Sequence, residues 1–280
     1  MRVRDFVLAA FAVVSMASCS LYADIVISNN FDGVADDTGP AFQLLTNGAN
    51  AGGGTFDATT GVVSVGGGSN GNTTATGFNN VSLAALGADV ESITATFVID
   101  SVDNVLFSRS NGFFIGLATG DGATVSDGTG LFNNTAEAVG LRFNSPDNTT
   151  AALNAIQLLT EPATGGTGAT ILQDGTIPTV ASIEDGFTFV LTLNNDGTLD
   201  ASTEGLSTEI SATGLAFSGP SFADFITNGV GVNSTFQGGE GGFTIDSVTV
   251  HAAVPVAVPE PSSLALLGLA SLGLVTRRRR

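Results

Sequence analysis

Apolar and polar residues alternate along several short segments of the chain. In residues 93–99, apolar side chains occupy every second position, at Ile93, Ala95, Phe97 and Ile99. Because successive side chains of a strand point to opposite faces, this pattern predicts a strand with one buried face. The same alternation recurs in 187–193 and 243–250, and further strands are predicted at 25–28, 61–65, 112–118, 137–143, 153–160, 197–203, 206–212 and 229–236.

The segments between these strands are rich in Gly, Asn, Asp, Ser and Thr. Asn195-Asp196-Gly197 separates two alternating runs, and Asp-Gly readily adopts the positive φ angles that a tight hairpin turn needs. Only short helices are predicted, at 81–87 and 221–227. Many short strands with frequent turns predict an all-β fold, an antiparallel β-sandwich or jelly roll, over residues 24–252.

The composition excludes several kinds of chemistry from this body. The segment 24–258 carries 24 acidic residues and two arginines, a formal charge of −22, so it lacks the basic surface that nucleic-acid binding requires. The single cysteine is Cys19, there is no lysine, and the single histidine is His251. A thiolate zinc site, a cysteine nucleophile and a lysine Schiff base are therefore excluded from the body.

The N-terminus has the layout of a secretory signal peptide, predicted over residues 1–23. Arg2 and Arg4 precede an apolar run over 6–17, and a small residue, Ala23, comes before the predicted cleavage site. This apolar run is too short to span a bilayer. An alternative interpretation is a lipoprotein signal, in which Cys19 would carry a lipid.

The C-terminus combines three features in a fixed order. After a linker over 253–258, Pro259, Glu260 and Pro261 lead into an apolar stretch over 263–276, and a cluster of arginines follows. The apolar stretch is shorter than the roughly 20 residues of a permanent span, which favours a transient anchor helix. A cationic block of this kind resists translocation across the membrane. The arginines of this cluster are Arg277, Arg278, Arg279 and Arg280.

This order of Pro-Glu-Pro, apolar helix and arginine cluster resembles the PEP-CTERM sorting signal over residues 259–280. The resemblance implies that the protein is an exported substrate of exosortase, a membrane protease-transpeptidase of Gram-negative bacteria that make extracellular polysaccharide. It also implies that Pro259, Glu260 and Pro261 form the recognition and processing motif, and that Arg277 to Arg280 are retained in the cytoplasm. The expected location is the cell envelope, the outer surface or the medium, after transient anchoring in the inner membrane.

The layout of the body resembles the concanavalin A-like or laminin-G-like sandwich. Three segments carry the resemblance: the run 92–99 followed closely by 111–117, the hairpin 187–200, and the closing run 242–250. The resemblance implies carbohydrate or protein binding, sometimes with calcium, and occasionally glycan hydrolysis.

Glycan hydrolysis and calcium binding can each be tested against the acidic residues. Glycosidases use two carboxylates that face one another, but neighbouring acids such as Glu184 and Asp185 point to opposite faces of a strand. The segment 194–200 has the Asp, Asn and Gly residues of a calcium loop without its terminal glutamate, and the hairpin turn already explains it. Asp24 and Asp246 form a second candidate calcium site, if the first and last strands meet. We expect no other cofactor.

Two classes of function remain. The favoured one is a non-enzymatic protein of the cell surface or extracellular matrix that is sorted by its C-terminal signal and associates with extracellular polysaccharide. Its expected partners are an exosortase-type enzyme, the membrane before processing, and polysaccharide. The alternative is a secreted carbohydrate-binding or glycan-hydrolysing sandwich protein. A concave sheet face with clustered carboxylates and an exposed aromatic ring would favour the alternative.

Overall fold

The computed structural model describes residues 21–31, 38, 43–44, 56–57, 63–66, 73–86, 89–103, 113–119, 137–144, 155–161, 170–175, 180–237 and 242–255. Ala23–Ala253 form one compact unit. The predicted anchor segment, the sorting motif and most of the predicted signal peptide lie outside the described residues. In the described part of the chain, no helix has the length and apolar character needed to cross a membrane.

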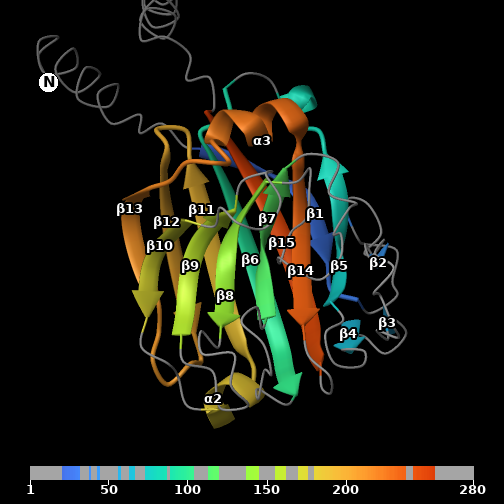
Figure 1. The fold of residues 1–280 in the computed structure, drawn as a ribbon. Coiled ribbons are helices and arrows are strands. Elements are labelled where there is room, and N and C mark those ends of the chain that lie inside the picture. The colour runs from blue at the N-terminus through green and yellow to red at the C-terminus, as the bar shows by residue number, and fades with distance from the viewer. Residues whose placement is uncertain are drawn as a thin grey trace, which may run out of the picture. The chain divides into compact units, whose positions relative to one another are not determined.

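Two antiparallel sheets stack face to face in this unit, as Figure 1 shows. Within the described ranges, eight strands form the first, which we call sheet A. Its strands are β1 (Leu21–Asn29), β3 (Phe56–Asp57), β4 (Val63–Gly66), β6 (Ser92–Asp103), β11 (Phe187–Asn194), β12 (Thr198–Glu204), β13 (Ser211–Ala216) and β15 (Gly242–Pro255). Seven follow the order β13-β12-β11-β6-β15-β4-β3, and β1 also pairs with β15.

The second sheet, sheet B, lies in front of sheet A in Figure 1. Its strands are β2 (Gln43–Leu44), β5 (Thr73–Val81), β7 (Phe113–Thr119), β8 (Glu137–Asn144), β9 (Ala155–Glu161), β10 (Thr170–Gly175) and β14 (Val230–Gln237). They follow the order β10-β9-β8-β7-β14-β5-β2. Three short helical segments complete the described residues: η1 (Ala84–Leu86), α2 (Val180–Glu184) and α3 (Phe222–Asn228).

The core lies between the two sheets and is built by alternation. Along β11 every second side chain is buried, from Phe187 to Leu193. Phe189 stacks on Phe97 of β6 with ring centroids 5.7 Å apart. Phe187 meets Phe143 of sheet B edge-on at 5.4 Å, which joins the two layers. Each buried phenylalanine contributes about 1.5–3 kcal/mol, so these four rings are a large part of the core, and the Phe187–Phe143 pair links its two layers.

The predicted all-β sandwich is confirmed, and so is the predicted hairpin. β11 and β12 pair antiparallel on either side of Asn195-Asp196-Gly197. Gly197 has a φ of 82°, which a side chain would disfavour. Its N–H donates to the Asn194 carbonyl at 3.1 Å and closes the turn.

Two predicted elements differ from the structure. Only Ser211 and Ala212 of the predicted strand 206–212 belong to β13. The segment before them forms bends that bury Leu206 and Ile210, and the Ile210 N–H donates to the Thr203 hydroxyl at 2.9 Å. The apolar side chains at these positions therefore mark a packed turn.

The predicted helix 81–87 is also wrong. Val81 is the last residue of β5, and only Ala84–Leu86 form a single 3-10 turn. The Ala84 N–H donates to the Ser82 hydroxyl at 3.3 Å at the start of this turn. Apolar spacing alone could not separate this short turn from a helix.

Candidate functional site

The side chains of sheet A that point away from sheet B form a polar surface, which we call the outer face of sheet A. On β11 this face carries Thr188, Val190 and Thr192, all half-buried. Thr192 lies opposite Thr94 of β6, and the two hydroxyls are 2.9 Å apart in a hydrogen bond. The alternation that fills the core with apolar side chains therefore covers the opposite face with hydroxyl groups.

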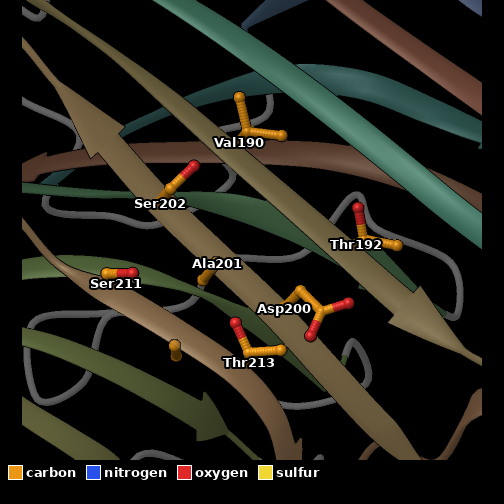
Figure 2. Close-up of a pocket in the computed structure, with 8 residues that line it drawn as sticks. Val190, Thr192, Asp200, Ala201, Ser202, Ser211 and Thr213 are labelled. Carbon is orange, nitrogen blue, oxygen red and sulfur yellow. The ribbon is translucent and has the colours of Figure 1, made fainter.

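A shallow depression of about 170 Å³ lies on this outer face, where β11, β12 and β13 run side by side (Figure 2). We call it the β12 depression. A register irregularity between Leu199 and Ala201 interrupts the pairing of β12 with β13 at this place, and such bulges bend a strand and redirect its side chains. The side chains that line the depression include Val190, Thr192, Asp200, Ser202, Ser211 and Thr213.

Asp200 is the only carboxylate among the residues that line the β12 depression. Its Oδ1 accepts a hydrogen bond from the Gly214 N–H at 2.7 Å. Its Oδ2 accepts one from Asn194 Nδ2 at 3.3 Å. An ionised carboxylate has about four lone-pair positions. Asp200 is therefore held in place by the fold and retains acceptor capacity toward the depression.

The other polar groups of the β12 depression are hydroxyls. Ser202, Ser211 and Thr213 are exposed, and their hydroxyls make no hydrogen bond within the described residues. A hydroxyl both donates and accepts hydrogen bonds. Together with Asp200 and the apolar side chain of Val190, these groups can hydrogen-bond a small, hydroxyl-rich molecule and cover one apolar side of it.

The hairpin that leads into β12 supplies hydrogen bonds to its own acidic residue, Asp196. Asp196 Oδ1 accepts hydrogen bonds from the Thr198 hydroxyl at 2.6 Å and from the Thr198 N–H at 2.9 Å. Both hydrogen bonds hold the pKa of Asp196 below its ordinary value of 3.8, and the bond from the Thr198 hydroxyl has the larger effect. This geometry supports the hairpin interpretation of 194–200 rather than a calcium loop.

The outer face of sheet B has a different character. Phe143 points toward sheet A, so the alternate positions of β8, which include Arg142, Gly140 and Ala138, lie on the outer face. Arg142 donates to Gln157 Oε1 of β9 from Nε at 3.0 Å and from Nη2 at 2.6 Å. The buried side chains on this face form an apolar cluster of Phe114, Ala118, Ala138 and Leu159.

A pair of glycines lies within this apolar cluster. Gly116 of β7 is in register with Gly140 of β8. A Cβ on Gly116 would lie 2.2 Å from the Val139 carbonyl oxygen and 2.9 Å from Cζ of the Phe114 ring. The ring therefore fills the space above both glycines, and neither position has room for a side chain.

Asn233 is the unusual polar residue of this face. It lies on β14, in register with Gly116, and is 1% exposed. Within the part of the chain that the structure describes, neither its Oδ1 nor its Nδ2 has a hydrogen-bond partner. A buried amide without partners costs about 1–3 kcal/mol for each unsatisfied group, so the Asn233 side chain lowers the free energy of unfolding.

The structure places the sequence-predicted calcium ligands on neighbouring strands. Asp24 lies on β1 and is half-buried, and Asp246 lies on β15 and is exposed. β1 pairs with β15, which confirms that the first and last described strands meet. Calcium takes six to eight oxygen ligands, and the described residues contain no group of three or more His, Cys, Asp or Glu side chains arranged to hold a metal. Calcium binding stays a prediction.

The β12 depression was not predicted from the sequence as a site. In the sequence, Asp200 belongs only to the calcium-loop pattern of 194–200, and no motif singles out Ser202 or Thr213. The alternation in 198–204 does place Asp200 and Ser202 on one face, opposite Leu199 and Ala201. That signal locates two of the polar groups, but it does not show that β13 adds Ser211 and Thr213.

The C-terminal segment matches a known family. The family model of the PEP-CTERM protein-sorting motif matches residues 257–280. The chain therefore carries this sorting motif, as predicted, and the motif implies export and processing by exosortase. No curated protein matches the chain.

Solved structures resemble the body in fold. The CBM2 module of the evolved Dit protein from Lactobacillus casei BL23 phage J-1 has a TM-score of 0.51 and 10% identity, covering 86% of this chain and 100% of that one. A Bacillus subtilis protein of unknown function with a galectin-like fold has a TM-score of 0.50 and 12% identity, covering 84% and 99%. The body is thus a lectin-like sandwich, in agreement with its concanavalin A-like resemblance.

Proposed function

We propose that the protein is a non-enzymatic component of the cell surface or extracellular matrix that binds extracellular polysaccharide. The observation that carries the proposal is the β12 depression, which offers a fixed carboxylate and exposed hydroxyl groups on the outer face of sheet A. The sorting motif adds that the chain is exported. The body is thus delivered to the compartment in which polysaccharide lies.

The lining of the β12 depression favours binding over hydrolysis. Glycosidases of the common kinds place two carboxyl groups about 5–10 Å apart on either side of the scissile bond. Asp200 is the single carboxylate of the depression, and no histidine lines it. The groups present can hold a sugar, but they do not provide the acid and base pair that cleavage needs.

A binding assay with the exported protein tests this function. The protein purified from the medium or surface of an exporting host is mixed with immobilised polysaccharides, with and without calcium. Retention on at least one polysaccharide, with no release of reducing ends, is expected. Release of reducing ends would favour the alternative, a glycan-hydrolysing protein, and no retention on any polysaccharide would contradict the proposal.

We further propose that processing occurs at Pro259, Glu260 and Pro261, while Arg277 to Arg280 remain in the cytoplasm. Mass spectrometry of the exported protein should then find a C-terminus close to Pro261. Changing Pro259 and Glu260 to alanine should leave the precursor in the inner membrane. An exported protein that still ends at Arg280 would contradict this proposal.

A further inference from the structure

The charge of the body restricts the kind of polysaccharide that it can bind. Between residues 24 and 258 the chain carries a formal charge of −22. Within the described residues the one arginine is Arg142, which lies on sheet B, and the chain has no lysine. Like charges brought together at an interface weaken binding. Among the described residues, the outer face of sheet A therefore carries no arginine or lysine with which to neutralise an acidic polysaccharide.

The size of the β12 depression restricts how much of a polymer it can hold. Pockets for drug-sized ligands measure about 300–1,000 Å³. The β12 depression measures about 170 Å³ and is open to solvent. It is therefore suited to one ring of a longer chain, with the neighbouring rings lying along the exposed strands.

The hydrogen-bonding groups of the depression are matched to the hydroxyls of an uncharged sugar. The Gly214 N–H and Asn194 Nδ2 fix the Asp200 carboxylate, which leaves about two of its lone-pair positions for donors outside the fold. Neighbouring hydroxyls of one sugar ring supply such donors. Ser202 and Thr213 can donate to or accept from further hydroxyls or the ring oxygen, and Val190 covers an apolar patch of the ring.

From these observations we infer that the β12 depression is a subsite for a single uncharged sugar unit of a neutral polysaccharide, with Asp200 accepting hydrogen bonds from two neighbouring hydroxyls. The inference rests on the proposed polysaccharide binding and names both its site and its ligand class. No covalent step is involved. The face that binds is the outer face of sheet A, and not that of sheet B.

The test compares matched variants of the exported protein on two probes. Dextran is the neutral polysaccharide and alginate is the acidic one. Asp200→Asn removes the charge and part of the acceptor capacity with little change in size. Ser202→Ala removes one exposed hydroxyl and leaves the bonds of Asp200 intact, so it remains informative if Asp200→Asn fails to fold. Glu204→Gln is the control, because Glu204 is exposed on the same strand and outside the depression.

The expected result is stronger retention on dextran than on alginate. Asp200→Asn should weaken dextran binding about tenfold, since hydrogen bonds to a charged group are strong. Ser202→Ala should weaken it about threefold, and Glu204→Gln should leave it unchanged. Stronger binding of alginate, or equal dextran binding by all four proteins, would overturn the inference while leaving polysaccharide binding intact. If neither dextran, alginate nor any other polysaccharide retains the unaltered protein, the proposed function fails as well.

Discussion

The outer faces of the two sheets differ in how far their side chains are buried. Along β11 of sheet A, buried and half-buried side chains alternate strictly. Along β7 of sheet B, Phe114–Thr119 are all buried. Sheet A therefore has one face in the core and one polar face in contact with water, whereas the central strands of sheet B are buried on both faces.

This difference separates the face that we propose to bind polysaccharide from the face that maintains the fold. On sheet A, the polar groups of the β12 depression are accessible and a substitution there leaves the core intact. On sheet B, the outer face holds the Gly116–Gly140 pair under the Phe114 ring. Substitutions on the two outer faces should consequently have very different effects.

The largest effect is expected from Gly116→Ala. The new Cβ would lie 2.2 Å from the Val139 carbonyl oxygen and 2.7 Å from Cα of Gly140, both backbone atoms that cannot move without disturbing the pairing of β7 and β8. We expect a loss of about 3 kcal/mol or more in the free energy of unfolding, measured by chemical denaturation.

Gly214→Ala on sheet A is the matched control for this substitution. A Cβ on Gly214 meets nothing within 4 Å, and its only penalty is the φ of 63°. That conformation costs a residue with a side chain about 1 kcal/mol. Equal losses for the two variants would show that the outer face of sheet B is no more tightly packed than that of sheet A.

The second effect has the opposite sign. Asn233→Leu replaces an unpartnered buried amide with an apolar side chain of similar size, so it should raise the free energy of unfolding by about 1–2 kcal/mol. Asn194→Leu on sheet A is the matched control and should lower it, because Asn194 donates to Thr198 and Asp200. A clear loss of stability in Asn233→Leu would show that the amide of Asn233 makes hydrogen bonds that stabilise the fold.

The third effect concerns the acidic surface. Raising sodium chloride from about 0.01 M to 0.1 M shortens the Debye length from about 30 Å to 10 Å and screens repulsion among the acids. We expect the melting temperature to rise by about 2–4 °C, equivalent to about 1 kcal/mol in a domain of this size. The combined variant Glu204→Gln and Asp246→Asn, which removes two exposed charges of sheet A, should show a smaller rise.

The same melting experiment tests calcium. At matched ionic strength, a specific site would raise the melting temperature further by mass action, and Asp246→Asn would remove that additional rise. A melting temperature that stays flat in sodium chloride and in calcium would contradict both the repulsion and the calcium hypotheses.

The smallest effect concerns the exposed hairpin of sheet A. The pKa of Asp196 is lowered in the folded state by its bonds from Thr198. Its contribution to stability is therefore complete above the ordinary pKa of 3.8 and is lost as the pH falls through the lower folded value. The difference in melting temperature between the unaltered protein and Asp196→Asn should shrink as the pH falls below about 4. A difference that stays constant down to about pH 2 would argue against this coupling.

The contrast between the sheets also explains what could be predicted from the sequence. Strands β6, β11 and β15 alternate clearly because only one of their faces is buried, and all three were predicted. β5 was missed because its residues, from Thr73 to Val81, are mostly small or polar, and it is defined by pairing with β14 and β2 rather than by its own pattern. β10 was missed as well, and as an edge strand it pairs only with β9.

The β12 depression could not be predicted for a related reason. Its polar groups come from three strands, and the shift of register between Leu199 and Ala201 decides which residues of β13 lie beside Asp200. Alternation assigns a side chain to a face, but it does not give the pairing partner across a bulge. The C-terminal motif, in contrast, is a contiguous stretch of sequence and was recognised in full.

The position of β15 has a consequence for the order of events during export. β15 is the last strand along the chain, yet it lies inside sheet A, where residues 242–253 pair with 92–103 of β6. Sheet A therefore cannot close until nearly the whole body has crossed the membrane. The sorting motif begins at Pro259, only four positions after β15 ends at Pro255. The last core strand thus crosses the membrane only shortly before the motif reaches its processing enzyme, so a body that folds slowly would meet that enzyme with its central sheet still open.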